Sequence, residues 1–187
     1  AGPLISVLFE RGEFGPADSV NTALALAIYG LGLPAFVLQK VLQPLYYARE
    51  DTRRPFHYAV ASLFVNAGVA VGLMPLIGFS AAAIGTTLAA WAMVAQLWAG
   101  SRSMGDAARL DARFLRRIWR IVAASLGMGV LLWLVADALG GMLGTAGLRY
   151  GALALLVAAG IVGYFALGFV LGAFRIADFR SSFRRER

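Results

Sequence analysis

Long uncharged stretches, separated by short charged ones, organise this chain. A transmembrane helix needs about 20 consecutive, mostly apolar residues. The stretches that approach or exceed this length cover residues 19–39, 55–101, 121–136 and 150–174. The second stretch has 47 residues, which is room for two spans, and apolar neighbours extend the third. The pattern therefore predicts five membrane-spanning helices.

The bounds of these helices follow from the stretches and from the turn signals between them. We expect spans at Ser19–Gln43, Phe56–Met74, Phe79–Ala99, Ile118–Leu139 and Tyr150–Phe174, after a helical stub that ends near Phe9. Pro75 and Gly78 favour a turn between the second and third spans. An open sheet cannot cross lipid, because its edge amides would stay unpaired. The predicted fold class is therefore an all-α integral membrane protein, a polytopic helical bundle.

Composition agrees with a membrane protein and leaves little material for catalysis. The chain is 60% hydrophobic and 14% charged, whereas soluble domains carry about 25% charged residues. The absence of cysteine excludes disulfides, thiolate catalysis and zinc–thiolate sites. One histidine and ten carboxylates, without a cluster at membrane depth or a glycine-rich phosphate loop, predict neither a metal site nor an enzyme.

The basic residues follow the predicted spans rather than one solvated face. If the stub exits on the outer side, 15 of the 17 lysines and arginines fall within residues 40–55, 100–120 and 175–187. Arg11 and Arg149 are the two exceptions. Cytoplasmic loops carry such an excess, so we expect these segments and the C-terminus in the cytoplasm. The net charge of +7 therefore does not indicate a nucleic-acid partner.

The chain begins with Ala1-Gly2-Pro3, without an initiator methionine or the basic region of a signal peptide. We expect it to be the C-terminal part of a longer protein. Residues 1–105 would contain the stub and three spans, and residues 106–187 a basic segment, two spans and a tail.

A basic amphipathic pattern precedes the fourth predicted span. Its residues divide between two helical faces, Arg109, Arg113, Arg116 and Arg120 on one and Leu110, Phe114 and Ile118 on the other. Such a segment can lie on the anionic inner leaflet. The alternative is that its charges only fix the topology of the span.

Two features of the first span can carry function. Pro34, near its middle, removes a backbone hydrogen bond and predicts a kink. That kink is either a tolerated membrane proline or a hinge beside a cavity. Lys40, flanked by Gln39 and Gln43, either extends to the lipid headgroups or meets an anionic substrate group in a polar cavity.

Polar and small residues inside the other spans give weaker signals. Asn66, Thr86 and Thr87 lie at mid-span, where a polar group needs a partner. They form either hydrogen bonds between helices or a contact to an ion or substrate. Small residues four apart can mark close helix packing, and they are Gly68 and Gly72, Ala159 and Gly163, and Gly168 and Gly172.

Four stretches of the sequence together resemble one family. They are Leu8–Phe14, Gly32–Phe36, Lys40–Pro55 and Gly78–Trp91. The run Tyr47-Ala48-Arg49-Glu50-Asp51-Thr52-Arg53-Arg54-Pro55 is the most specific. The chain resembles the MurJ (MviN) lipid II flippases, from the end of their ninth helix to their fourteenth.

This resemblance implies the second lobe of a MATE-like transporter of the MOP superfamily, followed by two extra C-terminal helices. Family members move the undecaprenyl-linked peptidoglycan precursor from the inner to the outer leaflet of the bacterial inner membrane by alternating access. We expect Lys40, Gln43, Arg49 and Arg53 to contact this substrate. The expected partners are membrane lipids, the precursor and an N-terminal lobe, without which the chain should not transport.

The resemblance also raises the question of a coupling ion. Some members bind sodium through an Asn, an Asp four residues later, and a Thr on the next helix. Asn66 and Thr86 match, but Ala70 stands where the carboxylate is expected. Without that charge, no cofactor is expected, and coupling to sodium or to the membrane potential stays the open alternative.

Two other functions stay open at this point. The protein could flip a different polyprenyl-linked saccharide, or it could be a membrane scaffold that recruits cell-wall enzymes. For a scaffold, substitutions at Lys40 and Pro34 should be harmless.

Overall fold

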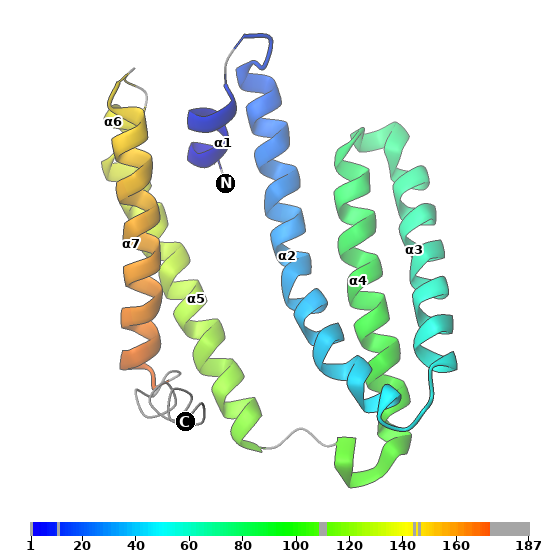
Figure 1. The fold of residues 1–187 in the computed structure, drawn as a ribbon. Helices are drawn as coiled ribbons and strands as arrows, with labels where there is room; N and C mark the ends of the chain where they lie inside the picture. The colour runs from blue at the N-terminus through cyan, green and yellow to red at the C-terminus, as the bar shows by residue number, and fades with distance from the viewer. Residues whose placement is uncertain (1, 11, 109–111, 144, 146, 173–187) are drawn as a thin grey trace, which may run out of the picture. The chain divides into compact units, whose positions relative to one another are not determined.

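The computed structural model describes residues 2–10, 12–108, 112–143, 145 and 147–172, with the side chains of 106–117 left out. Its elements are α1 (Gly2–Phe9), α2 (Pro16–Tyr47), α3 (Arg53–Ile77), α4 (Ser80–Ser101), the 3₁₀ segment η1 (Arg102–Ala108), α5 (Ala112–Ala138), α6 (Gly140–Leu143) and α7 (Arg149–Val170) (Figure 1). Five helices in this described part are long and apolar enough to cross a membrane. The predicted all-α membrane fold is confirmed.

The chain forms two compact units, Ala1–Arg109 and Leu110–Arg187. The predicted basic residues Arg109, Arg113 and Arg116, and the tail 175–187, lie outside the described side chains, so their placement stays a prediction. The backbone of α5 is helical from Ala112, six residues before the predicted start of that span.

Helix α2 is longer at both ends than its uncharged core. It begins at Pro16, because proline suits the first helical position, where no N–H is needed. The Asp18 carboxylate accepts the Gly15 N–H at 3.0 Å, which satisfies a donor at the helix start. The helix continues through Pro34 and Pro44 to Tyr47 and bends in its C-terminal half (Figure 1).

The turn between α3 and α4 is shorter than predicted. Pro75 lies inside the last turn of α3, which continues to Ile77, so the prediction that the helix ends at Met74 is wrong. A proline near the end of a helix removes one hydrogen bond without stopping the chain. The turn is made by Gly78, whose φ of 61° is costly for other residues, and its N–H donates to the Met74 carbonyl at 2.9 Å.

Helix α4 is the centre of the first unit. It lies between α2 and α3 and packs against both (Figure 1). In the most apolar 18-residue stretch of each helix, 50% of the residues are buried in α4, compared with 11% in α2 and 6% in α3. Small residues occupy much of its buried surface: Ala81, Ala83, Gly85, Ala89 and Ala90. Their size lets the neighbouring backbones come close, as is common between helices in lipid.

A tyrosine cluster closes one end of this unit. Tyr46 is fully buried and its hydroxyl donates to the Leu97 carbonyl of α4. Its ring meets Tyr58 of α3 edge-on, with 6.2 Å between centroids. A methyl group on Gly100 would lie 2.5 Å from both hydroxyls. Glycine is therefore required where three helices converge.

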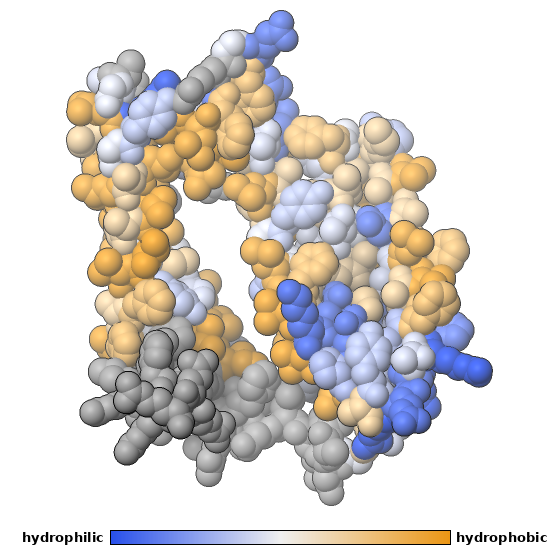
Figure 2. Space-filling view, viewed as in Figure 1, coloured by the Kyte–Doolittle hydropathy of each residue, from blue (hydrophilic) through white to orange (hydrophobic). Residues whose placement is uncertain are grey.

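The outward faces of these helices are apolar. Figure 2 shows hydrophobic side chains along the helices and hydrophilic ones gathered at the end that carries the α2–α3 loop. On α3, the exposed large hydrophobic side chains are Phe56, Leu63, Phe64, Val65, Val71, Met74, Leu76 and Ile77. A soluble protein rarely exposes so much contiguous apolar surface, so this face suits lipid or other membrane helices.

The second unit is built from α5 and α7. Leucines of α5 pack over glycines of α7: Leu132 lies 3.1 Å from where a Gly160 methyl would be, and Leu131 lies closer still to that of Gly163. The small-residue prediction is thus confirmed at Gly163. At Gly68 and Gly72 it stays a prediction, because a methyl group there would meet nothing within 4 Å among the described residues.

The packing at Gly85 predicts a stability difference between two glycine substitutions. A methyl group there would lie 2.8 Å from Asn66 Oδ1 and 2.9 Å from the Asn66 carbonyl oxygen, and this backbone atom cannot rotate away. Gly85→Ala should therefore destabilise the protein by about 1–3 kcal/mol, as overpacking does. Thermal unfolding in detergent measures the loss.

Gly72→Ala is the matched control, because its methyl group would meet open space in the described chain. It should leave the unfolding midpoint unchanged or raise it slightly. Equal midpoints for the two variants would show that α3 and α4 do not pack as described.

Candidate functional site

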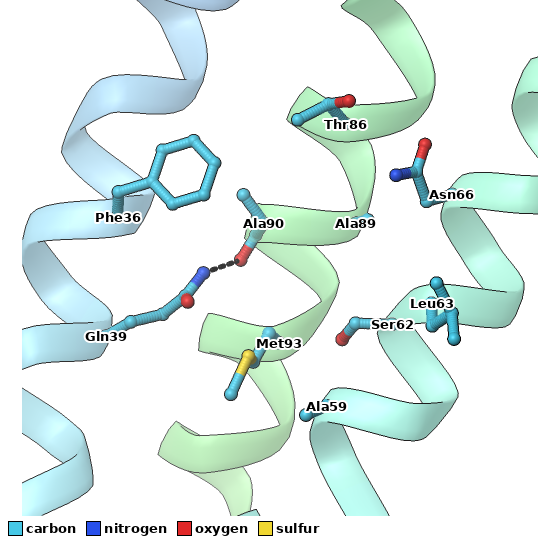
Figure 3. Close-up of a pocket in the computed structure, with 10 residues that line it drawn as sticks. All are labelled: Phe36, Gln39, Ala59, Ser62, Leu63, Asn66, Thr86, Ala89, Ala90 and Met93. Atoms are coloured by element: carbon cyan, nitrogen blue, oxygen red, sulfur yellow. Dashed lines mark hydrogen bonds between the residues drawn. The ribbon is translucent and has the colours of Figure 1, made fainter. Parts of the chain in front are cut away.

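A pocket of about 250 Å³ opens on the first unit beside α4. Three helices line it: Phe36 and Gln39 from α2, Ala59, Ser62, Leu63 and Asn66 from α3, and Thr86, Ala89, Ala90 and Met93 from α4 (Figure 3). Its walls are mainly apolar, and its polar groups are two amides and two hydroxyls. Ligand pockets commonly combine apolar walls with a few polar groups.

Small residues of α4 create this pocket. Ala89 and Ala90 are buried at its floor, where larger side chains would fill the space between α2 and α3. Helical spacing places the wall residues: Phe36 and Gln39 are three apart on α2, and Ser62 and Asn66 are four apart on α3.

Asn66 and Thr86 point toward one another across the gap between α3 and α4 (Figure 3). Neither side chain forms a hydrogen bond with another described residue, so their polar groups are available to the pocket. Ser62 differs, because its hydroxyl is 3.4 Å from Gln96 Nε2. Asn66 and Thr86, which the sequence analysis grouped as one ion site, line the same pocket. Their binding of an ion stays a prediction.

The surroundings of Asn66 do not fit a sodium ion. Ala70, one turn further along α3, packs so close to Gly85 that a methyl group on the glycine would lie 3.3 Å from its Cβ. No group of three or more acidic, histidine or cysteine side chains occurs among the described residues. The pocket lining offers only neutral amide and hydroxyl oxygens and no carboxylate, so nothing in it compensates the charge of a cation.

Lys40 and Gln43 lie on the flank of α2 that leads to the pocket. They follow Phe36 by four and seven residues, so all three share one side of the helix. Lys40 is exposed and forms no salt bridge with a described residue, whereas Gln43 is half-buried. Gln39 is fixed beside them, because its Nε2 donates to the Ala90 carbonyl at 3.0 Å.

Arg49 and Arg53 do not reach this pocket. Arg49 belongs to the α2–α3 loop, where its Nη2 donates to the Met104 carbonyl at 2.7 Å. Arg53 begins α3 and is exposed, and its carbonyl lies 2.7 Å from His57 Nδ1. The neighbouring Arg54 pairs with Asp51 at 3.2 Å. None of the four predicted substrate residues lines the pocket: Lys40 and Gln43 lie on α2, Arg49 in the α2–α3 loop and Arg53 at the start of α3.

Sequence reasoning missed several residues of the pocket wall. Ser62 precedes Asn66 by one helical turn, and that spacing could have revealed a polar strip on α3. Phe36 and Met93 gave no such signal, because each is one of many apolar residues in its span.

Comparisons with known proteins identify the family. The family model described as lipid II flippase MurJ matches residues 1–171. A probable lipid II flippase MurJ of Rhizobium meliloti (strain 1021) is 40% identical over 98% of this chain and 35% of its own length. Relatives of the same name in Rhizobium tropici and Vibrio cholerae are each 32% identical, over 98% and 97% of this chain.

The chain spans about a third of the length of these relatives. Flippases are transporters rather than catalysts of a chemical reaction, in agreement with the prediction of a non-enzyme. With five candidate spans, the chain is part of a multi-pass membrane protein. A family match over residues 1–171 and relatives aligned along nearly the whole chain lead to one conclusion: the chain belongs to the MurJ lipid II flippase family.

Proposed function

We propose that the protein containing this chain moves lipid II, the undecaprenyl-linked peptidoglycan precursor, from the inner to the outer leaflet of the bacterial inner membrane. The observation that carries this proposal is the family match over residues 1–171, together with relatives that bear the name lipid II flippase. The chain would supply part of the second lobe and the two final helices. The rest of the protein would supply the first lobe, so the chain alone should not transport.

The pocket and its flank suit the polar part of such a substrate. An anionic group is costly in lipid unless a positive charge accompanies it. Lys40 is an exposed cation without a described salt-bridge partner, one helical turn from Phe36 in the pocket wall. The free amide of Asn66 and hydroxyl of Thr86 offer neutral hydrogen bonds deeper in the pocket. We therefore assign Lys40 to the anionic group and the pocket to neutral polar groups.

Arg49 and Arg53 serve the cytoplasmic end in this proposal. Arg49 already holds the loop against Met104, and the exposed Arg53 can attract an anionic headgroup before it reaches the pocket. This assignment requires the α2–α3 loop to face the cytoplasm, where lipid II is made.

The transport function itself is tested by the full-length protein. It should restore growth to a bacterium depleted of its own lipid II flippase, and it should move fluorescent lipid II across the membrane of proteoliposomes. If neither occurs with well-expressed, correctly inserted protein, the proposal is wrong. Transport of another polyprenyl-linked saccharide in the same vesicles would identify a flippase of different specificity.

The charge of Lys40 generates a further prediction. Lys40→Gln should lower lipid II transport about tenfold or more, because a hydrogen bond to a charged group contributes roughly 1.5–3 kcal/mol. Lys40→Arg should retain most of the activity. Arg54→Gln is the control, since it removes an exposed arginine whose partner, Asp51, lies in the loop outside the pocket.

A scaffold would give the opposite result. For a scaffold, Lys40→Gln and Pro34→Ala should both support growth as well as the unsubstituted protein does. If both variants also transport lipid II at the unsubstituted rate, the substrate site does not lie on this flank of α2.

The proposed orientation is tested with single cysteines, which is convenient because the chain contains none. Ser103 in η1 and Thr145 before α7 are both exposed, and one span separates them. We expect a cysteine at position 103 to react from the cytoplasm and one at 145 from the periplasm. A membrane-impermeant maleimide, applied to intact cells and then to inverted vesicles, measures this. The reverse labelling pattern would contradict the cytoplasmic C-terminus.

A further inference from the structure

A proline in the middle of a membrane helix leaves backbone groups without partners. Pro34 has no N–H, so the Gly30 carbonyl lacks its usual donor, and the ring disturbs the turn before it. In lipid such a helix is tolerated when neighbouring helices satisfy the exposed backbone groups. Among the described side chains none donates to the Gly30 carbonyl itself, but two donate to the carbonyls of Ile28 and Leu31 on either side of it.

Two side chains of α4 donate to the turns that precede Pro34. Thr87 Oγ1 donates to the Ile28 carbonyl at 3.0 Å, and Trp91 Nε1 donates to the Leu31 carbonyl at 3.0 Å. Thr87 and Trp91 are four apart on α4, so both lie on one face, opposite carbonyls one turn apart on α2. The two bonds form together because the helices run side by side (Figure 1).

Gly32 permits this contact. A methyl group on it would lie 3.2 Å from Thr87 Oγ1 and 3.5 Å from Thr87 Cα. A larger side chain would push α4 away and lengthen the hydrogen bonds.

A third bond holds the turn that follows Pro34. Gln39 Nε2 donates to the Ala90 carbonyl at 3.0 Å, in the opposite direction to the other two bonds. Figure 3 shows this bond from Gln39 to Ala90. Ala90 is the residue next to Trp91, so the same turn of α4 contacts α2 on both sides of the proline.

We propose that Thr87, Trp91 and Gln39 form an α2–α4 brace that fixes the bend of α2 at Pro34 and so positions Lys40. The brace itself does not depend on the proposed function; only the role of Lys40 in binding the substrate rests on it. Lys40 lies six residues beyond Pro34, about 9 Å along the helix. A 20° change of bend, the size of a marked kink, would displace it by about 3 Å. The brace residues are positioning residues, and α2 moves together with α4 instead of flexing alone at Pro34.

Distances measured along α2 test the brace. Cysteines that replace the exposed Leu24 and Val41 carry spin labels on either side of Pro34, about 26 Å apart along the axis. In the full-length protein, free of other cysteines, pulsed electron resonance should give a narrow distance distribution. The double variant Thr87→Val, Trp91→Phe should give a distribution about twofold broader, since it loses both donors, while valine keeps the shape of threonine and phenylalanine keeps an aromatic ring.

Three further variants make the result specific. Thr87→Ser keeps the hydroxyl and should retain the narrow distribution. Trp98→Phe should also retain it, because Trp98 is exposed on the same helix and its indole N–H bonds to no described residue. If the double variant does not fold, Trp91→Phe alone replaces it. A distribution as narrow in the donor-free variant as in the unsubstituted protein overturns the brace.

Transport assays separate the brace from the proposed function. The double variant should lower lipid II transport about tenfold, the equivalent of roughly 1.4 kcal/mol from two lost hydrogen bonds. A broadened distribution with unchanged transport would overturn the positioning of Lys40. If the unsubstituted protein does not transport lipid II, the proposed function fails, and the distance measurement still decides whether the brace exists.

Discussion

The first unit depends on the short distance between α4 and its two neighbours. Gly32 of α2 and Gly85 of α4 allow backbone and side-chain atoms of adjacent helices to approach within ordinary contact distance. Lipid chains are as apolar as leucine, so helices in a membrane gain little from hiding apolar surface and rely on close packing and hydrogen bonds. The bonds from Thr87, Trp91, Gln39 and Tyr46 all cross this short distance.

The same packing produces the pocket and places a few polar groups in its mainly apolar wall. Small residues on α4 leave space between α2 and α3, and the helical spacing of Ser62 and Asn66 directs two polar groups into it. No charged side chain is among the residues that line the pocket. Lys40 is exposed and does not line the pocket, and the polar groups that do line it are neutral, which limits the cost of their burial in lipid.

Helix number and type were predictable from the sequence, because the bilayer sets the length of each span and charge is excluded from its centre. Exact ends were less predictable. Pro75 was expected to end α3 before the turn, yet near a helix end a proline costs one bond, and Gly78 decides where the chain turns. The glycines at 68 and 72 show the limit of spacing rules, since identical spacing occurs where the described chain offers no neighbour.

For the site, sequence reasoning found Asn66, Thr86 and Lys40 as polar exceptions within apolar spans. It could not find Phe36 or Met93, whose role depends on which faces of three helices meet. It also grouped Arg49 and Arg53 with Lys40, whereas the structure uses Arg49 to hold the α2–α3 loop against η1.

The central place of α4 also bears on how the protein is made. Helices α2 and α3 touch each other at few points, and both pack chiefly on α4. Since the ribosome completes α2 and α3 before α4, these two helices lack their main packing partner of the first unit when they first enter the bilayer. The apolar side chains of α2 and α3 allow both helices to stay in contact with lipid at this stage. Insertion of α4 then joins them.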